Sequence, residues 1–368
     1  MAPNLPPNPV PDFVDFSFAY REDLQLIIQK DNPQTWDYLE RIYRENFNVG
    51  YLQEGHALAE GYGGDFIAFV EQSIAQHKPS ARRVSEIGAG ACYLLNLLKQ
   101  DGYETVAIDP SPVSKDKGNA YGIEVIAEFY LSAGALPKSD VIVHYDVLEH
   151  IPDPVDFLRH HANDLRQGGM VIFAVPDCTP YITYGDISML LHEHLNYFDQ
   201  ESLRNVVEAA GFTVLEICKS GYGGVLYCAA LVSTKGQSWQ PKIGTQKFEQ
   251  FSENVIKTKE QIECFINSSR QPGCSLGCYV PLRAIPYLSM HGIYDGVRFF
   301  DDNPGIHGQY FDGFPIPVES QFNLLAHPVT HLLILSFVFG AKIRNRIFSL
   351  SPKNNMEICC LSDFVHPK

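Results

Sequence analysis

The residues best suited to chemistry in this sequence cluster in VSEIGAGACYLLNLLKQDGYETVAIDPS, residues 84–111. An apolar run ends near Glu86, and Gly88 and Gly90 follow, which lets the backbone turn sharply and approach a ligand without a Cβ in the way. After a helical pattern, a second apolar run stops at Asp109, about 20 residues on, as in a nucleotide-binding strand–helix–strand unit. A carboxylate there can accept hydrogen bonds from both hydroxyls of a ribose. We therefore expect an adenosine-containing cofactor, bound by Glu86, Gly88, Ala89, Gly90 and Asp109.

Two details of this loop favour S-adenosylmethionine (SAM) over a dinucleotide. Cys92 follows Ala91 where a dinucleotide loop places its third glycine, so the cradle for a pyrophosphate is incomplete. The negative charge of Glu86 would repel a pyrophosphate, but it suits the positively charged methionine end of SAM. The structural alternative is a glycine turn that only joins a core strand to a core helix. We expect SAM as the cofactor.

The pattern from Arg83 to Thr234 alternates strands and helices with short joints, which predicts a doubly wound, Rossmann-like sheet. After an expected helix at 200–210, the runs FTVLEICKS and VLYCAALVS flank the turn GYGG, so a hairpin makes the last strand antiparallel. Class I methyltransferases end their sheet in this way, whereas dinucleotide folds finish parallel. The first five strands are expected at 84–87, 105–108, 124–127, 141–145 and 170–175.

A second segment, DVIVHYDVLEHIPDPVDFLRHHANDLRQGGMVIFAVPD, resembles the fourth strand, following helix and fifth strand of class I SAM-dependent methyltransferases. The patterns VLEHIPDP and GGxxxxxVPD carry this resemblance. It implies that His144 and Tyr145, at the end of the strand, lie beside the methionine moiety and the acceptor. Glu128 and Phe129, after the third strand, would lie near the adenine. Each of the four could instead be an ordinary residue at the end of a strand.

The segment HEH, with His192, Glu193 and His194, offers either metal ligands or a base. Alternating residues of an extended segment rarely converge on one ion without further ligands, so we expect no metal. Methyl transfer is an in-line displacement that requires an aligned acceptor and, for a hydroxyl or a carbon acid, removal of a proton. A neutral histidine suits that task, so we expect His194 as the base and Glu193 to orient it. Alternatively, this polar segment only caps the helix expected from Gln200.

Together, HEHLNYFDQESL, the GYGG hairpin, FFDDNPGIHGQYFDGFPIPV and HLLILSFVFGAKI resemble the sugar C-methyltransferases that act on nucleotide-linked deoxysugars. The similarity covers roughly residues 80–350. It implies a SAM domain, a smaller α/β domain after it, and a Tyr-His-Glu-His motif whose Tyr, Glu and last His act in catalysis. Glu193 and His194 match this motif, but Leu191 replaces the tyrosine and removes its hydroxyl.

Two further departures indicate a changed acceptor. Family members usually begin with a four-cysteine zinc module, but no cysteine precedes Cys92 here. Where the family has a lysine at the end of a loop in the distal domain, this chain has GCYVPLRAIPYL, with Arg283 as the nearby cation. Our first hypothesis is O-methylation of a hydroxyl or carboxylate on a small molecule. The alternatives are C-methylation of a nucleotide-linked keto sugar and a non-catalytic, SAM-binding regulator of a partner. We expect the acceptor to contact Tyr51, His56, His192, Tyr222 and Arg283.

The chain divides into three expected regions: an N-terminal arm and helical lid (1–75), the SAM domain (76–235) and a C-terminal α/β domain (236–368). The first region has a proline-rich arm, aromatic and leucine residues at helical spacing, and a flexible EGYGGDF. It would either cover the cofactor pocket or serve only as a packing extension. A helical pattern from Phe248 to Phe265 would join the domains or form a homodimer contact.

Composition limits the partners. The 368 residues carry a formal net charge of −15 and no basic stripe, which argues against nucleic acid. No apolar stretch reaches the roughly 18 residues that a membrane span needs, and the N-terminus does not resemble a signal peptide, so we expect a cytoplasmic protein. The nine cysteines include no C-x-x-C pair, which favours reduced thiols.

Overall fold

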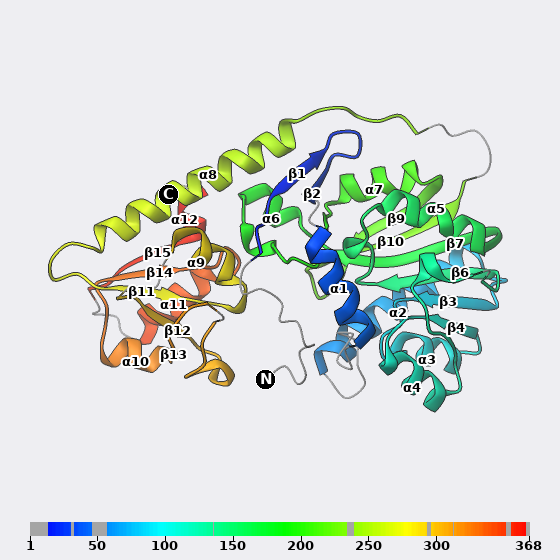
Figure 1. Cartoon of the computed structure of the whole chain (residues 1–368), viewed down its shortest axis with the longest axis horizontal. Helices are drawn as coiled ribbons and strands as arrows, with labels where there is room; N and C mark the ends of the chain where they lie inside the picture. Colours follow the sequence, from blue (N-terminus) through cyan, green and yellow to red (C-terminus); the bar gives the residue numbers. More distant parts are fainter. Residues whose placement is uncertain are drawn as a thin grey trace. The chain divides into compact units, whose positions relative to one another are not determined.

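The computed structural model describes residues 14–30, 33–45, 57–134, 136–233, 239–292, 296–311, 313–350 and 355–365. These residues fall into two compact units (Figure 1). The first comprises Phe16–Thr179 and His192–Thr245, and the second includes Pro180–Leu191 and the chain from Gln246 onward. The division differs from the expected boundaries, because residues 16–75 join the SAM domain and 180–191 join the C-terminal unit.

The first unit is built on a seven-stranded sheet with the order β5-β4-β3-β6-β7-β10-β9. Its strands are β3 (Arg83–Ile87), β4 (Glu104–Ile108), β5 (Glu124–Ile126), β6 (Ser139–Tyr145), β7 (Leu165–Pro176), β9 (Phe212–Lys219) and β10 (Val225–Val232). The pairs from β5 to β7 are parallel, whereas β10 is antiparallel to both of its neighbours. All seven expected strands are therefore present, and the antiparallel last strand confirms the class I arrangement.

Helices cover both faces of this sheet. They are α2 (Ala57–His77), α3 (Tyr93–Gln100), α4 (Pro112–Tyr121), α5 (Pro154–Asp164) and α7 (Gln200–Ala209). Side chains of β7 alternate between the faces, since Phe173 lies in the core cluster with α5 and α7, whereas Ile172 lies in the cluster with α2 and α3. A strand buried on both faces needs apolar residues throughout, which explains its continuous apolar run.

The N-terminal part contributes more structure than an arm. Strands β1 (Phe18–Arg21) and β2 (Leu26–Gln29) form a hairpin, and β2 also pairs with β8 (Asn196–Tyr197). The sequence analysis did not predict this small sheet. Next comes α1 (Pro33–Glu45), in the region expected to be helical.

The expectation that EGYGGDF is flexible is wrong, because this segment lies within α2. Its glycines allow aromatic rings to approach the helix closely. A Cβ on Gly61 would lie 3.0 Å from the ring of Tyr222, and one on Gly63 would lie 2.6 Å from the ring of Tyr93. The glycine spacing therefore reflects packing of the helix, not chain flexibility.

The second unit is a smaller α/β domain, as expected. Its five strands are all parallel, in the order β13-β12-β11-β14-β15. They are β11 (Leu276–Tyr279), β12 (Arg298–Asp301), β13 (Val318–Ser320), β14 (His331–Ile334) and β15 (Glu357–Cys360). Its helices are α8 (Gln246–Ser268), α9 (Ile285–His291), α10 (Gln321–Ala326), α11 (Gly340–Leu350) and α12 (Leu361–Val365), with α6 (Thr179–Tyr184) before them.

Hydrogen bonds explain why residues 180–191 join this unit. The hydroxyl of Tyr287 donates to Asp186 (2.9 Å) and accepts from the backbone N–H of Ile187 (3.1 Å). In α8, which matches the expected Phe248–Phe265 helix, Phe251 and Ile262 are buried. A homodimer contact through α8 stays a prediction.

Two general expectations can be compared with the structure. No helix among the described residues is long and apolar enough to cross a membrane. The nine cysteines all lie within the described residues, and none of them forms a disulfide.

Glycine packing in the first unit gives a stability prediction. A Cβ on Gly118 of α4 would lie 2.1 Å from Val125, so Gly118→Ala should lower the free energy of unfolding by roughly 1–3 kcal/mol. Gly64 is the matched control, because it is exposed in α2 and nothing lies within 4 Å of a Cβ there. Gly64→Ala should raise the free energy of unfolding by about 0.5–1 kcal/mol. Urea unfolding followed by circular dichroism measures both, and a Gly118→Ala protein as stable as the parent would contradict the packing argument.

Candidate cofactor site and catalytic group

A cavity of about 570 Å³ lies at the carboxyl ends of β3, β4 and β6. The order of the sheet reverses between β3 and β6, which is where open α/β sheets bind their ligands. The loops after these strands supply most of the wall. They contribute residues 88–91, 109–111 and 145–147, and the wall continues through 129–132 and 150–152.

The glycine loop after β3 needs its glycines. Gly88 and Gly90 have φ angles of 69° and 48°, in the left-handed region that glycine adopts readily. A Cβ on Gly88 would also lie 2.6 Å from a methyl group of Val147, across the cavity wall. The backbone of this turn can therefore come close to a ligand, as the sequence predicts for a cofactor loop.

Asp109 fixes the shape of this loop. Its buried carboxylate accepts hydrogen bonds from the backbone N–H of Gly90 (2.8 Å) and of Ser111 (2.7 Å). Burial raises the pKa of Asp109, and these hydrogen bonds oppose the shift. Each carboxylate oxygen keeps a further lone pair, so the group can also accept from a ribose hydroxyl. Asp109 thus joins the loops after β3 and β4, a role that the sequence analysis did not assign to it.

The surroundings of Glu86 indicate whether the cavity suits the positive charge of SAM. Its side chain is only 3% exposed, it lines the cavity, and its Oε2 has no hydrogen-bond partner among the described residues. Burial, and then the charge of Asp109, raise the pKa of Glu86 well above its usual range. An unsatisfied buried carboxylate of this kind suits a cationic group such as the ammonium of SAM.

The structure divides the other expected cofactor contacts. Ala89, Phe129 and Tyr145 line the cavity. Glu128 is exposed and lies outside the lining. His144 is fully buried and stacks on Phe173, with ring centroids 4.6 Å apart.

His144 and Tyr145 differ because successive side chains of β6 point to opposite faces of the sheet. His144 therefore lies in the core beside Phe173, whereas Tyr145 lines the cavity. Burial lowers the pKa of His144 well below its usual range, as befits a neutral histidine of the core.

Helix α1 contributes Glu40 and Tyr43 to the cavity wall, and a lid in this region stays a prediction. The hydroxyl of Tyr43 lies 3.5 Å from Nδ1 of His150. Tyr51 and His56, the residues that the sequence analysis named here, lie outside the described residues.

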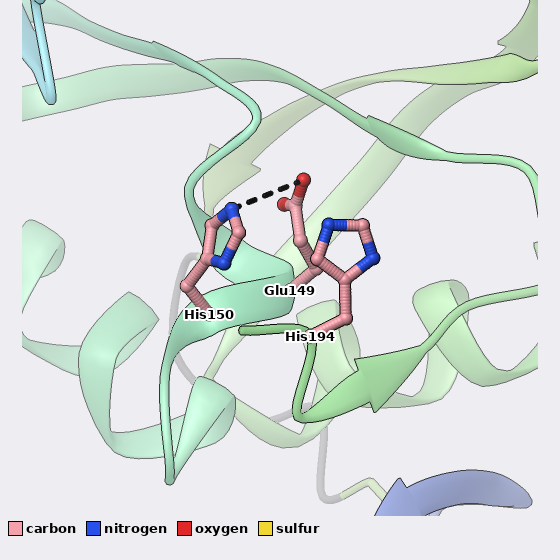
Figure 2. A group of neighbouring side chains, drawn as sticks. All are labelled: Glu149, His150 and His194. Carbon is pink, nitrogen blue, oxygen red and sulfur yellow. Dashed lines mark ion pairs between the residues drawn. The ribbon is translucent and has the colours of Figure 1, made fainter. Parts of the chain in front are cut away.

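A group of three side chains adjoins the cavity. Glu149 and His150 end a short helical turn (Leu148–His150) after β6, and His194 comes from the segment before β8 (Figure 2). Their ligand atoms all lie within 4.8 Å of one another. Nε2 of His150 lies 3.8 Å from Oε1 of Glu149, and the rings of His150 and His194 are 4.9 Å apart. His150 lines the cavity.

Backbone hydrogen bonds hold the two segments of this group together. The N–H of Leu195 donates to the carbonyl of Glu149 (2.7 Å), and the side-chain amide of Asn196 donates to the carbonyl of Ile151 (2.7 Å). Nδ1 of His150 lies 2.7 Å from the carbonyl oxygen of Glu193. The contribution of Glu193 is thus its backbone, because its side chain is exposed.

Burial dominates the electrostatics of the group. Glu149 is 1% exposed, and burial together with the charges of Asp146 and Glu193 raises its pKa well above the usual range. Burial lowers the pKa of His150, which the hydrogen bond to Glu193 partly opposes. A neutral imidazole beside a cavity can accept a proton or ligate a metal ion.

Sequence reasoning found His194 but missed Glu149 and His150. Both lie in LEHIPDP. An acidic residue and a histidine soon after a buried strand are the pattern that could have identified them.

Three expected acceptor contacts lie elsewhere than in the cavity lining. His192 packs against Phe16, with centroids 5.7 Å apart. Tyr222 is 58% exposed and packs against Tyr62 (5.2 Å). Arg283 is exposed in the second unit.

The sheet order, the antiparallel β10, the glycine loop and the acidic residues Glu86 and Asp109 define a class I SAM-dependent methyltransferase domain. In agreement, a family model described as a methyltransferase domain matches residues 59–217. The chain is a SAM-dependent methyltransferase.

Relatives in known proteins include a C-methyltransferase, NovU of Streptomyces niveus, which is 22% identical over 283 residues. That match covers 71% of this chain and 67% of NovU. A ubiquinone biosynthesis O-methyltransferase of Caulobacter sp. (strain K31) is 33% identical over 101 residues, 25% of this chain and 40% of that protein. Among solved structures, the 1,6-didemethyltoxoflavin-N1-methyltransferase of Burkholderia thailandensis gives a TM-score of 0.42 at 16% identity, covering 57% of this chain and 96% of that one.

The role of Asp109 can be tested by cofactor binding. Asp109→Ala removes two hydrogen bonds from backbone N–H groups to a carboxylate and should weaken binding of S-adenosylhomocysteine roughly 10- to 100-fold. Isothermal titration calorimetry measures the effect. Asp116→Ala removes the same charge from an exposed position of α4 and serves as the control. Equal affinities for Asp109→Ala and the parent would remove Asp109 from the cofactor site.

Proposed function

We propose that this enzyme transfers the methyl group of SAM to an oxygen of a small molecule, either a hydroxyl or a carboxylate. The observation that carries this proposal is the Glu149–His150–His194 group at the wall of the cofactor cavity. A cavity of about 570 Å³ has the size of a small-molecule site. A hydroxyl acceptor needs alignment and also help in losing its proton. The group can supply that help.

The surroundings of His150 and His194 suit this role. His150 lines the cavity, and its contact with the carbonyl of Glu193 fixes the ring so that Nε2 carries the free lone pair. His194, the expected base, packs against His150 and gives the group a second imidazole. Proton removal from the acceptor therefore rests on the pair rather than on His194 alone.

C-methylation of a nucleotide-linked keto sugar is the second candidate. The similarity to the C-methyltransferase NovU favours it, because that match extends over 71% of this chain. By contrast, the match to the O-methyltransferase of Caulobacter covers 25% of the chain. Against C-methylation stands Leu191, where the sugar enzymes that the sequence resembles carry a tyrosine. C-methylation and O-methylation of a hydroxyl both need a base, and both fit the same group.

A nucleic-acid acceptor is disfavoured by charge. The formal net charge of −15 opposes binding to a phosphate backbone, so we keep a small molecule as the substrate. A SAM-binding regulator without catalysis is the third candidate. It leaves the buried acid and two histidines beside the cavity without a purpose.

Transfer of labelled methyl groups to panels of small alcohols, small acids and nucleotide-linked keto sugars tests the proposal. If the acceptor is a hydroxyl or a carbon acid, His194→Ala should lower kcat roughly 10²- to 10⁴-fold while binding of S-adenosylhomocysteine is kept. A carboxylate is already ionised at neutral pH, so His194→Ala should then leave substantial activity.

The control is His160→Ala, on the exposed face of α5, which should leave kcat unchanged. Methylation of the keto sugars alone would replace O-methylation with C-methylation. Binding of SAM without transfer to any panel would instead support the regulator.

A further inference from the structure

Glu149 has a buried carboxylate without a hydrogen-bond donor among the described residues. It is 1% exposed, and neither of its oxygens has a hydrogen-bond partner among the described residues. Its ion-pair partner in that part of the chain is His150, at 3.8 Å. Burying an ionised carboxylate without close partners is costly, which leaves this position suited to a cation. We propose that Glu149, His150 and His194 bind a divalent transition-metal ion, with Zn²⁺ as the type.

The ligand set matches known metal chemistry. Two imidazoles and one carboxylate form the protein ligands of catalytic zinc sites and of non-haem iron sites, which keep open positions for other ligands. Zinc bonds of about 2.0–2.1 Å place neighbouring ligand atoms of a tetrahedron about 3.3 Å apart. Here the ligand atoms lie within 4.8 Å of one another, and the His150–Glu149 pair is at 3.8 Å. Side-chain movements that shift the ligand atoms by about 1 Å would bring them to the separations of a zinc site.

The second contact of His150 resembles that of a metal-bound histidine. Such histidines donate the N–H of their other ring nitrogen to a carbonyl or carboxylate, which fixes the tautomer and the orientation of the ring. Nδ1 of His150 lies 2.7 Å from the carbonyl oxygen of Glu193, and this arrangement leaves Nε2 facing Glu149. Figure 2 shows the side chains of Glu149 and His150 next to the ring of His194.

Nearby charge favours a cation. Asp146 and Glu193 act on Glu149 with negative charge, so the group lies in a region of negative potential. Asp146 also lines the cavity, and its φ angle of 53° is one that few non-glycine residues adopt. Such a backbone conformation persists only where surrounding contacts hold it, so the position of Asp146 on the cavity wall is fixed by its neighbours.

The sequence argument against a metal concerned His192 and His194 as neighbours in one segment. In the structure, His192 instead packs against Phe16, and His194 meets two residues from a different segment. Those segments are joined by the hydrogen bonds of Leu195 and Asn196, so the three ligands are positioned before any ion binds. The missing ligands that the sequence argument required are thus Glu149 and His150.

This inference deepens the proposed function and rests on it for its catalytic meaning. Because His150 lines the cavity, an ion held by this group would adjoin the acceptor. With an ion bound, the imidazole lone pairs would be ligands and not bases. The ion would then assist loss of the acceptor proton in place of the free histidine pair, because a metal ion lowers the pKa of a hydroxyl that it binds.

Co²⁺ is the probe for the site, because tetrahedral nitrogen and oxygen coordination gives visible absorption bands. The full-length protein, stripped with a chelator and without an affinity tag, is titrated with Co²⁺ and then with Zn²⁺ as competitor. We expect one strongly bound Co²⁺ per chain, displaced by one Zn²⁺. Charge-transfer bands from thiolate would indicate binding at cysteines and would overturn the assignment.

Variants locate the ion. Glu149→Gln and His194→Asn should each weaken Co²⁺ binding at least about 10-fold, the usual minimum for the loss of a ligand or of its support. His160→Ala, an exposed histidine of α5, is the control and should bind Co²⁺ like the parent. Binding of S-adenosylhomocysteine reports that each variant is folded. If one of the two ligand variants does not fold, the other carries the test.

The outcomes separate this inference from the proposed function. Parent protein that binds neither Co²⁺ nor Zn²⁺, or variants that bind as tightly as the parent, would overturn the metal site. Methyl transfer that persists in chelator would then still support the enzyme. Specific metal binding without methyl transfer to any panel would support the site while contradicting the proposed reaction.

Discussion

Three carboxylates are buried at the edge of a single sheet, and the site depends on how each of them is satisfied. Asp109 accepts hydrogen bonds from two backbone N–H groups, which shapes the loop that faces the cofactor. Within the part of the chain that the structure describes, Glu86 has an unpartnered oxygen on the cavity wall, which SAM can complement with its positive charge. Glu149 has two such oxygens beside two histidines. Because isolated buried carboxylates are costly, the positions of Glu86 and Glu149 favour binding of a ligand.

The small sheet of β1, β2 and β8 explains how the third carboxylate acquires its neighbours. The backbone N–H of Gln29 in β2 donates to the carbonyl of Leu195 (2.8 Å), and the N–H of Leu195 donates to the backbone carbonyl of Glu149 (2.7 Å). His194 is thereby held against the turn that follows β6. The N-terminal hairpin thus helps to position the group, so residues before the cofactor loop contribute to the shape of the site.

The large sheet could be predicted because buried parallel strands are continuous apolar runs and GYGG marks a hairpin. The cofactor loop was predictable for the same local reason, since its glycines and Asp109 lie at fixed offsets. Pairing of β2 with β8 joins segments far apart in the sequence, and no local pattern reports it. The orientation of His144 was missed because adjacent residues of a strand point to opposite faces of the sheet. A placement that is wrong by one residue therefore moves a side chain from the cavity to the core. EGYGGDF was misinterpreted because glycine spacing is similar for a flexible turn and for close helix packing.

The boundary between the two compact units passes between Leu191 and His192. The position that carries a tyrosine in the resembled sugar enzymes therefore falls in the second unit, whereas Glu149, His150 and His194 all lie in the first. Their positions follow from hydrogen bonds and ring contacts within that first unit. Loss of the tyrosine hydroxyl consequently leaves the group intact.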